Sequence, residues 1–90
     1  MKVCKKFEIK NKLGLHARAA ALLVQTVNRF SSEVKISKDG LMVDARSILG
    51  VLTLAATKGS QILVEAGGKD AEEAVHAIER LVEKKFYEEE

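Results

Sequence analysis

Two hydrophobic periodicities alternate along the chain, and their order is the feature that most restricts its fold. Residues 2–10, 33–38 and 60–66 have apolar side chains at alternate positions, which is typical of strands with one buried face. Residues 16–29 and the segment after Asp70 repeat apolar residues at helical spacing. Because every such element has one apolar face to bury, the pattern predicts one sheet with helices packed on a single face.

Turn and capping signals place two shorter elements between these. Asp39-Gly40 separates residues 33–38 from residues 41–44, and both turn residues tolerate positive φ, so the pair predicts a two-residue hairpin turn. Ser47 is expected to be the N-cap of a short helix. The predicted inward face of that helix comprises Ile48, Val51, Leu52 and Ala55, whereas Leu49 and Leu54 fall off it.

The last helix is predicted to begin with a capping box, in which Asp70 bonds the N–H of Glu73 and Glu73 reaches back. The final four residues, Tyr-Glu-Glu-Glu, are expected to form a frayed, solvated tail. The predicted order of elements is therefore β-α-β-β-α-β-α. The apolar stripe of this helix comprises Ala71, Ala74, Val75, Ile78, Leu81, Val82 and Phe86.

Length and composition exclude several classes of protein. The 90 residues suffice for one small domain, expected to span residues 1–90. Fifteen basic and 13 acidic residues give a net charge of +2, which is too even a balance to indicate a nucleic-acid partner. A single cysteine, a charged N-terminal segment and the lack of an 18-residue apolar run predict a cytoplasmic protein without membrane insertion.

The stretch LGLHARAA, residues 13–20, places His16 at or beside the start of the first helix. The N–H groups of Ala17, Arg18 and Ala19 would lack intrahelical partners there, and the positive end of the helix dipole makes such a place an anion site. The Arg18 guanidinium can grip phosphate oxygens in two places. The positive surroundings favour a neutral, nucleophilic imidazole, so the arrangement suits a histidine that accepts and passes on a phosphoryl group. On these residues alone, a plain helix cap remains the alternative.

The stretch GLHARAA, followed by a long helix and, about thirty residues on, by ARSILGVLTLAATKGSQI, resembles the HPr family. These are histidine-containing phosphocarrier proteins of the bacterial phosphoenolpyruvate-dependent phosphotransferase system, and the resemblance extends over essentially the whole chain. It implies an α+β open-faced β-sandwich, with a four-stranded antiparallel sheet and three helices on one face. It also implies that His16 accepts phosphate at Nδ1 from enzyme I, that Arg18 stabilises the phosphoryl group, and that a IIA-type protein receives it.

The protein resembles a component of a phosphotransferase chain more than an independent enzyme. Nothing in the sequence demands a cofactor, a metal or more than a monomer, and a monomer is expected. The resemblance identifies Ser47 as a regulatory site for an HPr kinase/phosphorylase, although an N-cap role alone would account for this serine. Phosphate there would add about two negative charges beside a partner surface. The residues expected to dock partners are Ile48, Leu49, Gly50, Leu52 and Thr53.

Ala19 departs from the commonest family pattern, HARPA or HTRPA, in which proline follows the arginine. Alanine restores an N–H that is predicted to be one more donor to the phosphate. HARAA also resembles the nitrogen-related branch of the family, often called NPr, which leaves open a regulatory relay that is not coupled to sugar transport.

Two readings lie outside the family. One is a small α+β module that binds metabolites or RNA, although nearly absent strand aromatics argue against base stacking. The other is a metal site built from His16, His76 and Cys4, which has no spacing motif to support it, and His76 is instead expected on the surface.

Overall fold

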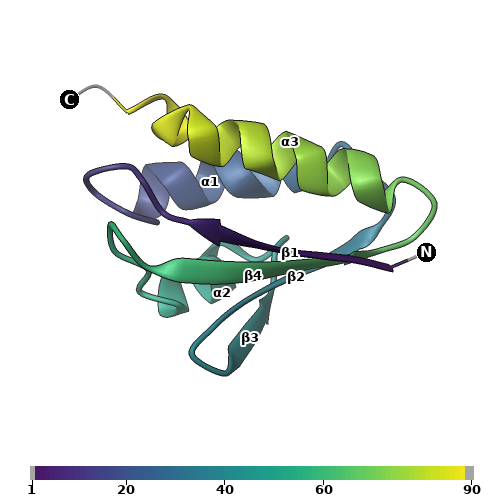
Figure 1. The fold of residues 1–90 in the computed structure, drawn as a ribbon, viewed down its shortest axis with the longest axis horizontal. Helices are drawn as coiled ribbons and strands as arrows, with labels where there is room; N and C mark the ends of the chain where they lie inside the picture. Colours follow the sequence, from purple (N-terminus) through teal and green to yellow (C-terminus); the bar gives the residue numbers. More distant parts are fainter. Residues whose placement is uncertain (1, 89–90) are drawn as a thin grey trace.

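The computed structural model describes residues 2–88 and forms a layered α+β fold (Figure 1). The predicted order of strands and helices is confirmed. In chain order the elements are β1 (Lys2–Glu8), α1 (Ala17–Val27), β2 (Glu33–Lys38), β3 (Leu41–Asp44), α2 (Ile48–Thr53), β4 (Gln61–Gly67) and α3 (Ala71–Glu83), followed by a short turn of helix, η1 (Lys85–Tyr87).

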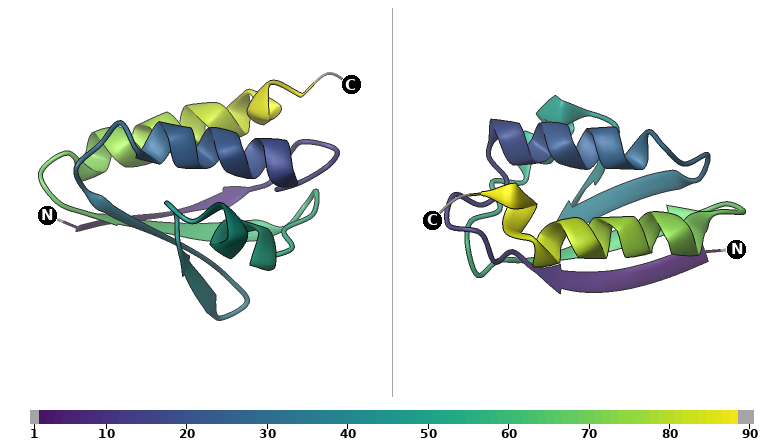
Figure 2. Two further views of the ribbon diagram at one scale, coloured as in Figure 1. Left: turned by 180° about the vertical axis from the view of Figure 1, so that it is seen from behind. Right: turned by 90° about the horizontal axis from the view of Figure 1, so that it is seen from above.

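The four strands form one antiparallel sheet in the order β1-β4-β2-β3. Helices α1 and α3 lie side by side over one face, and α2 lies beside α1 toward β3, as the two views in Figure 2 show. The predicted fold class, an open-faced sandwich with helices on a single face, is confirmed. The other face of the sheet carries polar side chains such as those of Lys35 and Lys6.

The core lies between the sheet and the helices, and the predicted stripes supply it. Every residue of the predicted α3 stripe, from Ala71 to Phe86, is buried. The β2–β3 hairpin turn is also confirmed, with Asp39 and Gly40 at φ +50° and +86°. Within residues 2–88 no helix is long and apolar enough to cross a membrane.

The capping box at the start of α3 is wrong. Asp70 is the N-cap residue, but its side chain makes no capping bond. Its carboxylate instead accepts hydrogen bonds from the backbone N–H and hydroxyl groups of Ser31 and Ser32, in the loop that follows α1. The Ser32 hydroxyl is the main cause that lowers the pKa of Asp70 to about 2. Asp70 therefore ties the start of α3 to the start of β2.

The predicted rotation of α2 is also wrong in part. The helix has only six residues and ends at Thr53, so helical spacing does not extend to Ala55, which is exposed at φ +49°. Val51 and Leu54 are the residues that enter the core. Ile48, which was expected to face inward, is 41% exposed. The outward surface of α2 is consequently more apolar than predicted.

Candidate functional site

A tight loop brings the chain to the start of α1. Gly14 has φ +67°, and a Cβ at this position would lie 2.3 Å from the carbonyl oxygen of Ala56. That same oxygen accepts a hydrogen bond of 2.9 Å from the N–H of Leu15. The backbone can approach this closely only because residue 14 has no side chain. The contact pins the segment after α2 against the entry to α1, one residue before His16.

His16 is the N-cap residue of α1, as the sequence predicts. Its backbone is extended, with φ −76° and ψ −179°, and its carbonyl accepts the first helical hydrogen bond from Ala20 at 2.8 Å. The imidazole makes no capping bond. The side chain is 30% exposed, so the ring is held at the surface and not enclosed. This histidine is therefore available to an approaching molecule.

The hydrogen-bond donors at the start of α1 differ from the prediction in one respect. Ala17 and Arg18 are exposed, and the Arg18 side chain takes part in no ion pair within residues 2–88. Ala19, however, has no exposed surface, because it packs into the core below the helix. Its N–H is not presented to solvent, so the amides that an anion can reach are those of Ala17 and Arg18.

Glu88 is the residue at this site that sequence reasoning missed. One carboxylate oxygen lies 3.5 Å from Nε2 of His16, and the Glu88 side chain is only 9% exposed. The carboxylate accepts hydrogen bonds from the Asn11 side-chain amide at 3.1 Å and the Leu13 N–H at 3.1 Å. These bonds, that of Asn11 first, lower the pKa of Glu88 below its usual value. The ring thus faces a fixed negative charge that the sequence-based argument for a positive environment left out.

A left-handed turn carries Glu88 to this position. Lys85, Phe86 and Tyr87 all have φ between +54° and +56°, a region that side chains other than glycine seldom adopt. Burial of Phe86 in the core holds the turn. The expectation of a frayed tail is wrong for Tyr87 and Glu88, and for the last two residues it lies outside the described part of the chain. The only sequence signal was Phe86, which extends the α3 stripe beyond its helix.

These groups surround a shallow, open cavity of about 470 Å³. It combines an imidazole that has one nitrogen facing a carboxylate with the side chain of Arg18, an exposed residue in the first turn of α1. No hydrogen bond within residues 2–88 involves Nδ1 of His16. A ring nitrogen without a hydrogen-bond partner, beside the cationic side chain of Arg18, is an arrangement suited to an attack on phosphorus. The cavity is lined by Leu13, His16, Arg18, Phe86, Tyr87 and Glu88.

Ser47 is confirmed as the N-cap of α2, and its hydroxyl accepts a hydrogen bond of 2.9 Å from the N–H of Gly50. The residue is exposed. A Cβ added at Gly50 would lie 3.1 Å from the Ser47 hydroxyl and 3.3 Å from Cβ of Val43, so the side chains of Ser47 and Val43 leave little room for a larger residue at this position.

The residues expected to dock partners differ in how far their side chains are exposed. Leu49 is 76% exposed, and Ile48 beside it is also exposed. Thr53 is exposed, but its hydroxyl donates to the carbonyl of Gly50 at 2.5 Å. Leu52 packs in part against the core. An apolar surface therefore exists on α2, and Ile48 and Leu49 supply most of it.

The remaining candidates stay apart from this site. His76 is exposed on α3, as expected, with Nδ1 3.8 Å from a Glu79 carboxylate oxygen. Cys4 is exposed on β1. In the part of the chain that the structure describes, no group of three or more His, Cys, Asp or Glu side chains is arranged to hold a metal ion.

Fold and site together define a class: an open-faced α+β sandwich that displays a half-exposed histidine at the start of its first helix. The model of the family described as PTS-HPr, "PTS HPr component phosphorylation site", matches residues 3–84. This chain belongs to the HPr family. Membership removes the alternative of an unrelated metabolite- or RNA-binding module.

Individual relatives agree with this assignment. The chain is 50% identical over 78 residues to the phosphocarrier protein HPr of Cupriavidus necator, covering 87% of this chain and 88% of the relative. It is 49% identical over 80 residues to the HPr-like protein Crh of Halalkalibacterium halodurans, covering 89% and 95%.

Solved structures agree as well. The fold matches a crystal structure of HPr-C-His from Thermoanaerobacter tengcongensis with a TM-score of 0.93 and 46% identity, covering 98% of this chain and 99% of that one. It also matches an HPr dimer from the same organism with a TM-score of 0.78 and 49% identity, covering 91% and 94%.

Proposed function

We propose that this chain, as a single domain over residues 1–90, is a monomeric cytoplasmic phosphocarrier. His16 accepts a phosphoryl group from phosphorylated enzyme I, which obtains it from phosphoenolpyruvate, and passes it to a IIA-type protein. The observation that carries this proposal is the surface histidine at the start of α1, with Nε2 facing the buried Glu88 carboxylate and the other nitrogen unshared. Membership of the HPr family supports the same reaction.

The chemistry assigns one role to each group. The Nδ1 lone pair of His16 attacks phosphorus, the new N–P bond forms as the donor's bond to phosphorus breaks, and the donor keeps that electron pair. The proton must stay on Nε2 for Nδ1 to be nucleophilic, and the Glu88 carboxylate favours that tautomer. Arg18 and the N–H groups of Ala17 and Arg18 then stabilise the charge on the phosphoryl oxygens.

A carrier must be reached by two different partners at the same atom. A shallow cavity and a ring that is 30% exposed support such access. The exposed apolar side chains of Ile48 and Leu49 support a docking surface on α2, next to α1. We extend this surface to Gly50, Leu52 and Thr53, of which Leu52 contributes least because it packs partly inward.

The direct test is incubation with enzyme I and phosphoenolpyruvate, using wild type and His16→Ala. We expect the wild type to take up acid-labile phosphate and the variant to take up none, because an N–P bond hydrolyses in acid. Equal labelling of the two proteins would reject His16 as the acceptor. The His76→Ala variant is the matched control and is expected to be labelled like the wild type.

We further propose that an HPr kinase/phosphorylase phosphorylates Ser47. The exposed hydroxyl at the N-cap of α2 supports this assignment, since a phosphate there would meet the positive end of a helix. It would also place about two negative charges beside Ile48 and Leu49 and repel an acidic partner. With the kinase and ATP, wild type is expected to gain acid-stable phosphate that Ser47→Ala lacks; no acid-stable label on the wild type would end this claim.

A second candidate function is a mainly regulatory relay. Similarity to the HPr-like protein Crh and the HARAA stretch, which resembles the nitrogen-related branch, favour it. The two functions differ in the acceptor. Phosphorylated protein should pass its label to a sugar-type IIA protein if the chain serves transport. Transfer to a nitrogen-related IIA protein alone would favour the regulatory relay.

A further inference from the structure

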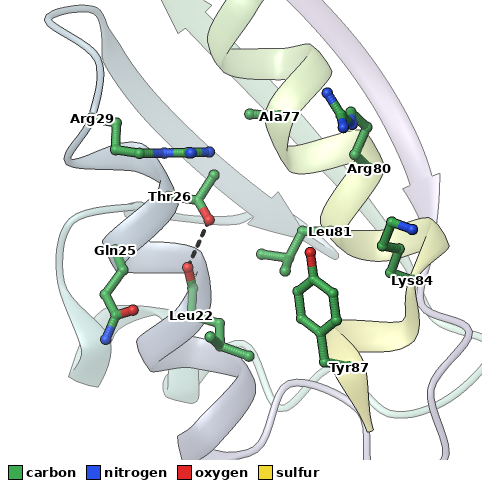
Figure 3. Close-up of a pocket in the computed structure, with 9 residues that line it drawn as sticks. All are labelled: Leu22, Gln25, Thr26, Arg29, Ala77, Arg80, Leu81, Lys84 and Tyr87. Atoms are coloured by element: carbon green, nitrogen blue, oxygen red, sulfur yellow. Dashed lines mark hydrogen bonds between the residues drawn. The ribbon is translucent and has the colours of Figure 1, made fainter.

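A second cleft lies between α1 and α3 (Figure 3), and Tyr87 lines both this cleft and the His16 cavity. It has a volume of about 360 Å³, enough for a small molecule. Nothing in the proposed phosphoryl transfer uses it. Its lining residues are Leu22, Gln25, Thr26, Arg29, Ala77, Arg80, Leu81, Lys84 and Tyr87.

Three cationic side chains line this cleft, and none of the lining residues within residues 2–88 is acidic. Arg29 follows the end of α1, whereas Arg80 and Lys84 belong to α3 and its C-cap. Figure 3 shows the Arg29 side chain extended toward α3, whereas the Lys84 ammonium group points away from Arg29. Within residues 2–88 none of them has an acidic partner within 4.0 Å. Cations near helix C-termini complement the helix dipole, which accounts for their positions in the sequence but not for their presence around one cleft. Like charges held together repel one another, and an anion between them would remove that repulsion.

The rest of the cleft is suited to an apolar group. Leu81 is buried beneath it, and Leu22 and Ala77 are partly buried on its two sides. The Tyr87 hydroxyl points into the space in Figure 3 and is a possible hydrogen-bond donor. The Thr26 hydroxyl already donates to the carbonyl of Leu22 at 2.9 Å, so it has no proton left to offer.

We propose that this cleft binds a small organic phosphate, with the phosphate held by Arg29 and Arg80, Lys84 at the border of the cleft, and the apolar part over Leu22 and Leu81. Guanidinium groups hold phosphate oxygens in pairs, and Arg29 and Arg80 supply one such group from each side of the cleft. Glu73 borders the adjoining depression, where it lies with Arg29, Arg80 and His76. The charge of Glu73 repels an anion from the adjoining depression. We therefore expect the phosphate in the cleft that Lys84 lines.

Phenyl phosphate is the probe that combines a phosphate dianion with an apolar ring. Titrated into ¹⁵N-labelled protein, it is expected to shift the amide signals of α1 and α3 around the cleft in a saturable manner. Arg80→Gln and Arg29→Gln should each weaken binding by at least about tenfold, as expected for the loss of a charge-assisted bidentate contact. Lys35→Gln is the matched control, since it removes the same charge from the open face of the sheet, and it should bind like the wild type.

Three results would overturn the proposal. One is affinity within about twofold of wild type in Arg80→Gln and Arg29→Gln. Another is shifts centred on Ala17 and Arg18, which would assign the binding to the His16 cavity. The third is inorganic phosphate that binds as tightly as phenyl phosphate, because the apolar floor would then contribute nothing. Phosphoryl uptake at His16 by Arg80→Gln is expected to equal that of wild type, so the two sites are tested separately.

Discussion

At the residue scale, the neighbours of His16 distinguish its two ring nitrogens. The approach of Glu88 to Nε2, supported by Asn11 and Leu13, leaves Nδ1 as the nitrogen without a partner in the described chain. A neutral imidazole carries one proton, and the group that bonds one nitrogen selects the tautomer. In the proposed reaction, the carboxylate would therefore act through the ring and not by contact with the phosphoryl group.

Glu88→Gln is expected to slow phosphoryl uptake from enzyme I about fivefold, because a neutral amide holds the Nε2 proton less firmly than a carboxylate. The imidazole ¹⁵N shifts should report a smaller share of the Nε2–H tautomer. Glu83→Gln removes a similar charge from the exposed end of α3 and should change neither quantity. An unchanged tautomer ratio in Glu88→Gln would show that Glu88 does not orient the ring.

Ala19→Pro is expected to keep the fold, because the N–H of residue 19 has no intrahelical partner in the first turn of α1. Since that N–H is also hidden from solvent, phosphoryl uptake should stay within about twofold of wild type. Circular dichroism and the enzyme I assay measure the two expectations. Loss of most helical signal would contradict the assigned start of α1.

At the scale of elements, short non-local contacts connect the ends of helices. Arg46 donates to the carbonyl oxygens of Phe30 at 2.7 Å and Ser32 at 3.0 Å, beyond the end of α1. Asp70 binds the N–H groups of the same loop from the start of α3. Neither contact follows a sequence pattern, because each joins residues at least 14 positions apart. Periodicity predicts where an element lies, whereas these contacts fix how elements meet.

Gly14→Ala is expected to lower the free energy of unfolding by about 2–3 kcal/mol, since alanine is disfavoured at positive φ and its Cβ would collide with Ala56. Urea denaturation measures this loss. Gly59→Ala is the matched control, because Gly59 also has positive φ but nothing lies within 4 Å of an added Cβ. Its loss should be only about 1 kcal/mol. Equal losses would mean that the close approach at Gly14 contributes nothing.

Asp70 makes stability depend on pH in the acid range. Its pKa is about 2 in the folded protein, held down first by the Ser32 hydroxyl, whereas an aspartate in an unfolded chain titrates near about 3.9. The carboxylate therefore stabilises the fold above about pH 4, and this contribution disappears as the pH falls toward 2. Asp70→Asn should be less stable at neutral pH and show a flatter decline over that window.

Thermal melts from pH 7 to pH 2 measure this difference. Asp39→Asn is the control, because Asp39 is an exposed turn residue whose left-handed φ asparagine also tolerates. Its pH profile should follow that of the wild type. Parallel profiles of wild type and Asp70→Asn below pH 4 would exclude Asp70 as the source of acid sensitivity.

At the scale of the whole molecule, strand and helix order, layer arrangement and the place of His16 were predictable from the sequence. Each depends on local periodicity or on a capping position, which neighbouring residues determine. Three features were not predictable. The exposure of Ile48 depends on where a six-residue helix stops, the burial of Ala19 depends on packing under α1, and Glu88 reaches His16 only through a turn held by Phe86. All three arise from tertiary contacts that local patterns do not encode.

Substitutions on α2 and on β3 should differ in their effect on the interaction with enzyme I. Leu49→Glu is expected to raise the KM of enzyme I for this protein about tenfold, because it puts a charge into the exposed apolar surface of α2. Its melting temperature should change little, since the side chain is 76% exposed. Leu41→Glu alters an exposed leucine of β3 outside that surface and should leave KM unchanged. A KM for Leu49→Glu equal to that of wild type would remove α2 from the docking surface.

The position of Glu88 beside His16 has a practical consequence for handling this protein. Strand β1 begins at the far end of the sheet from the loop that carries His16, while Glu88 sits directly on that loop (Figure 1). An affinity tag, fluorophore or surface tether joined beyond Glu88 would pull on the carboxylate that faces the reactive ring. The same attachment ahead of Lys2 would leave the ring undisturbed. Apparent transfer rates from differently tagged preparations should therefore be compared only after the tag is removed.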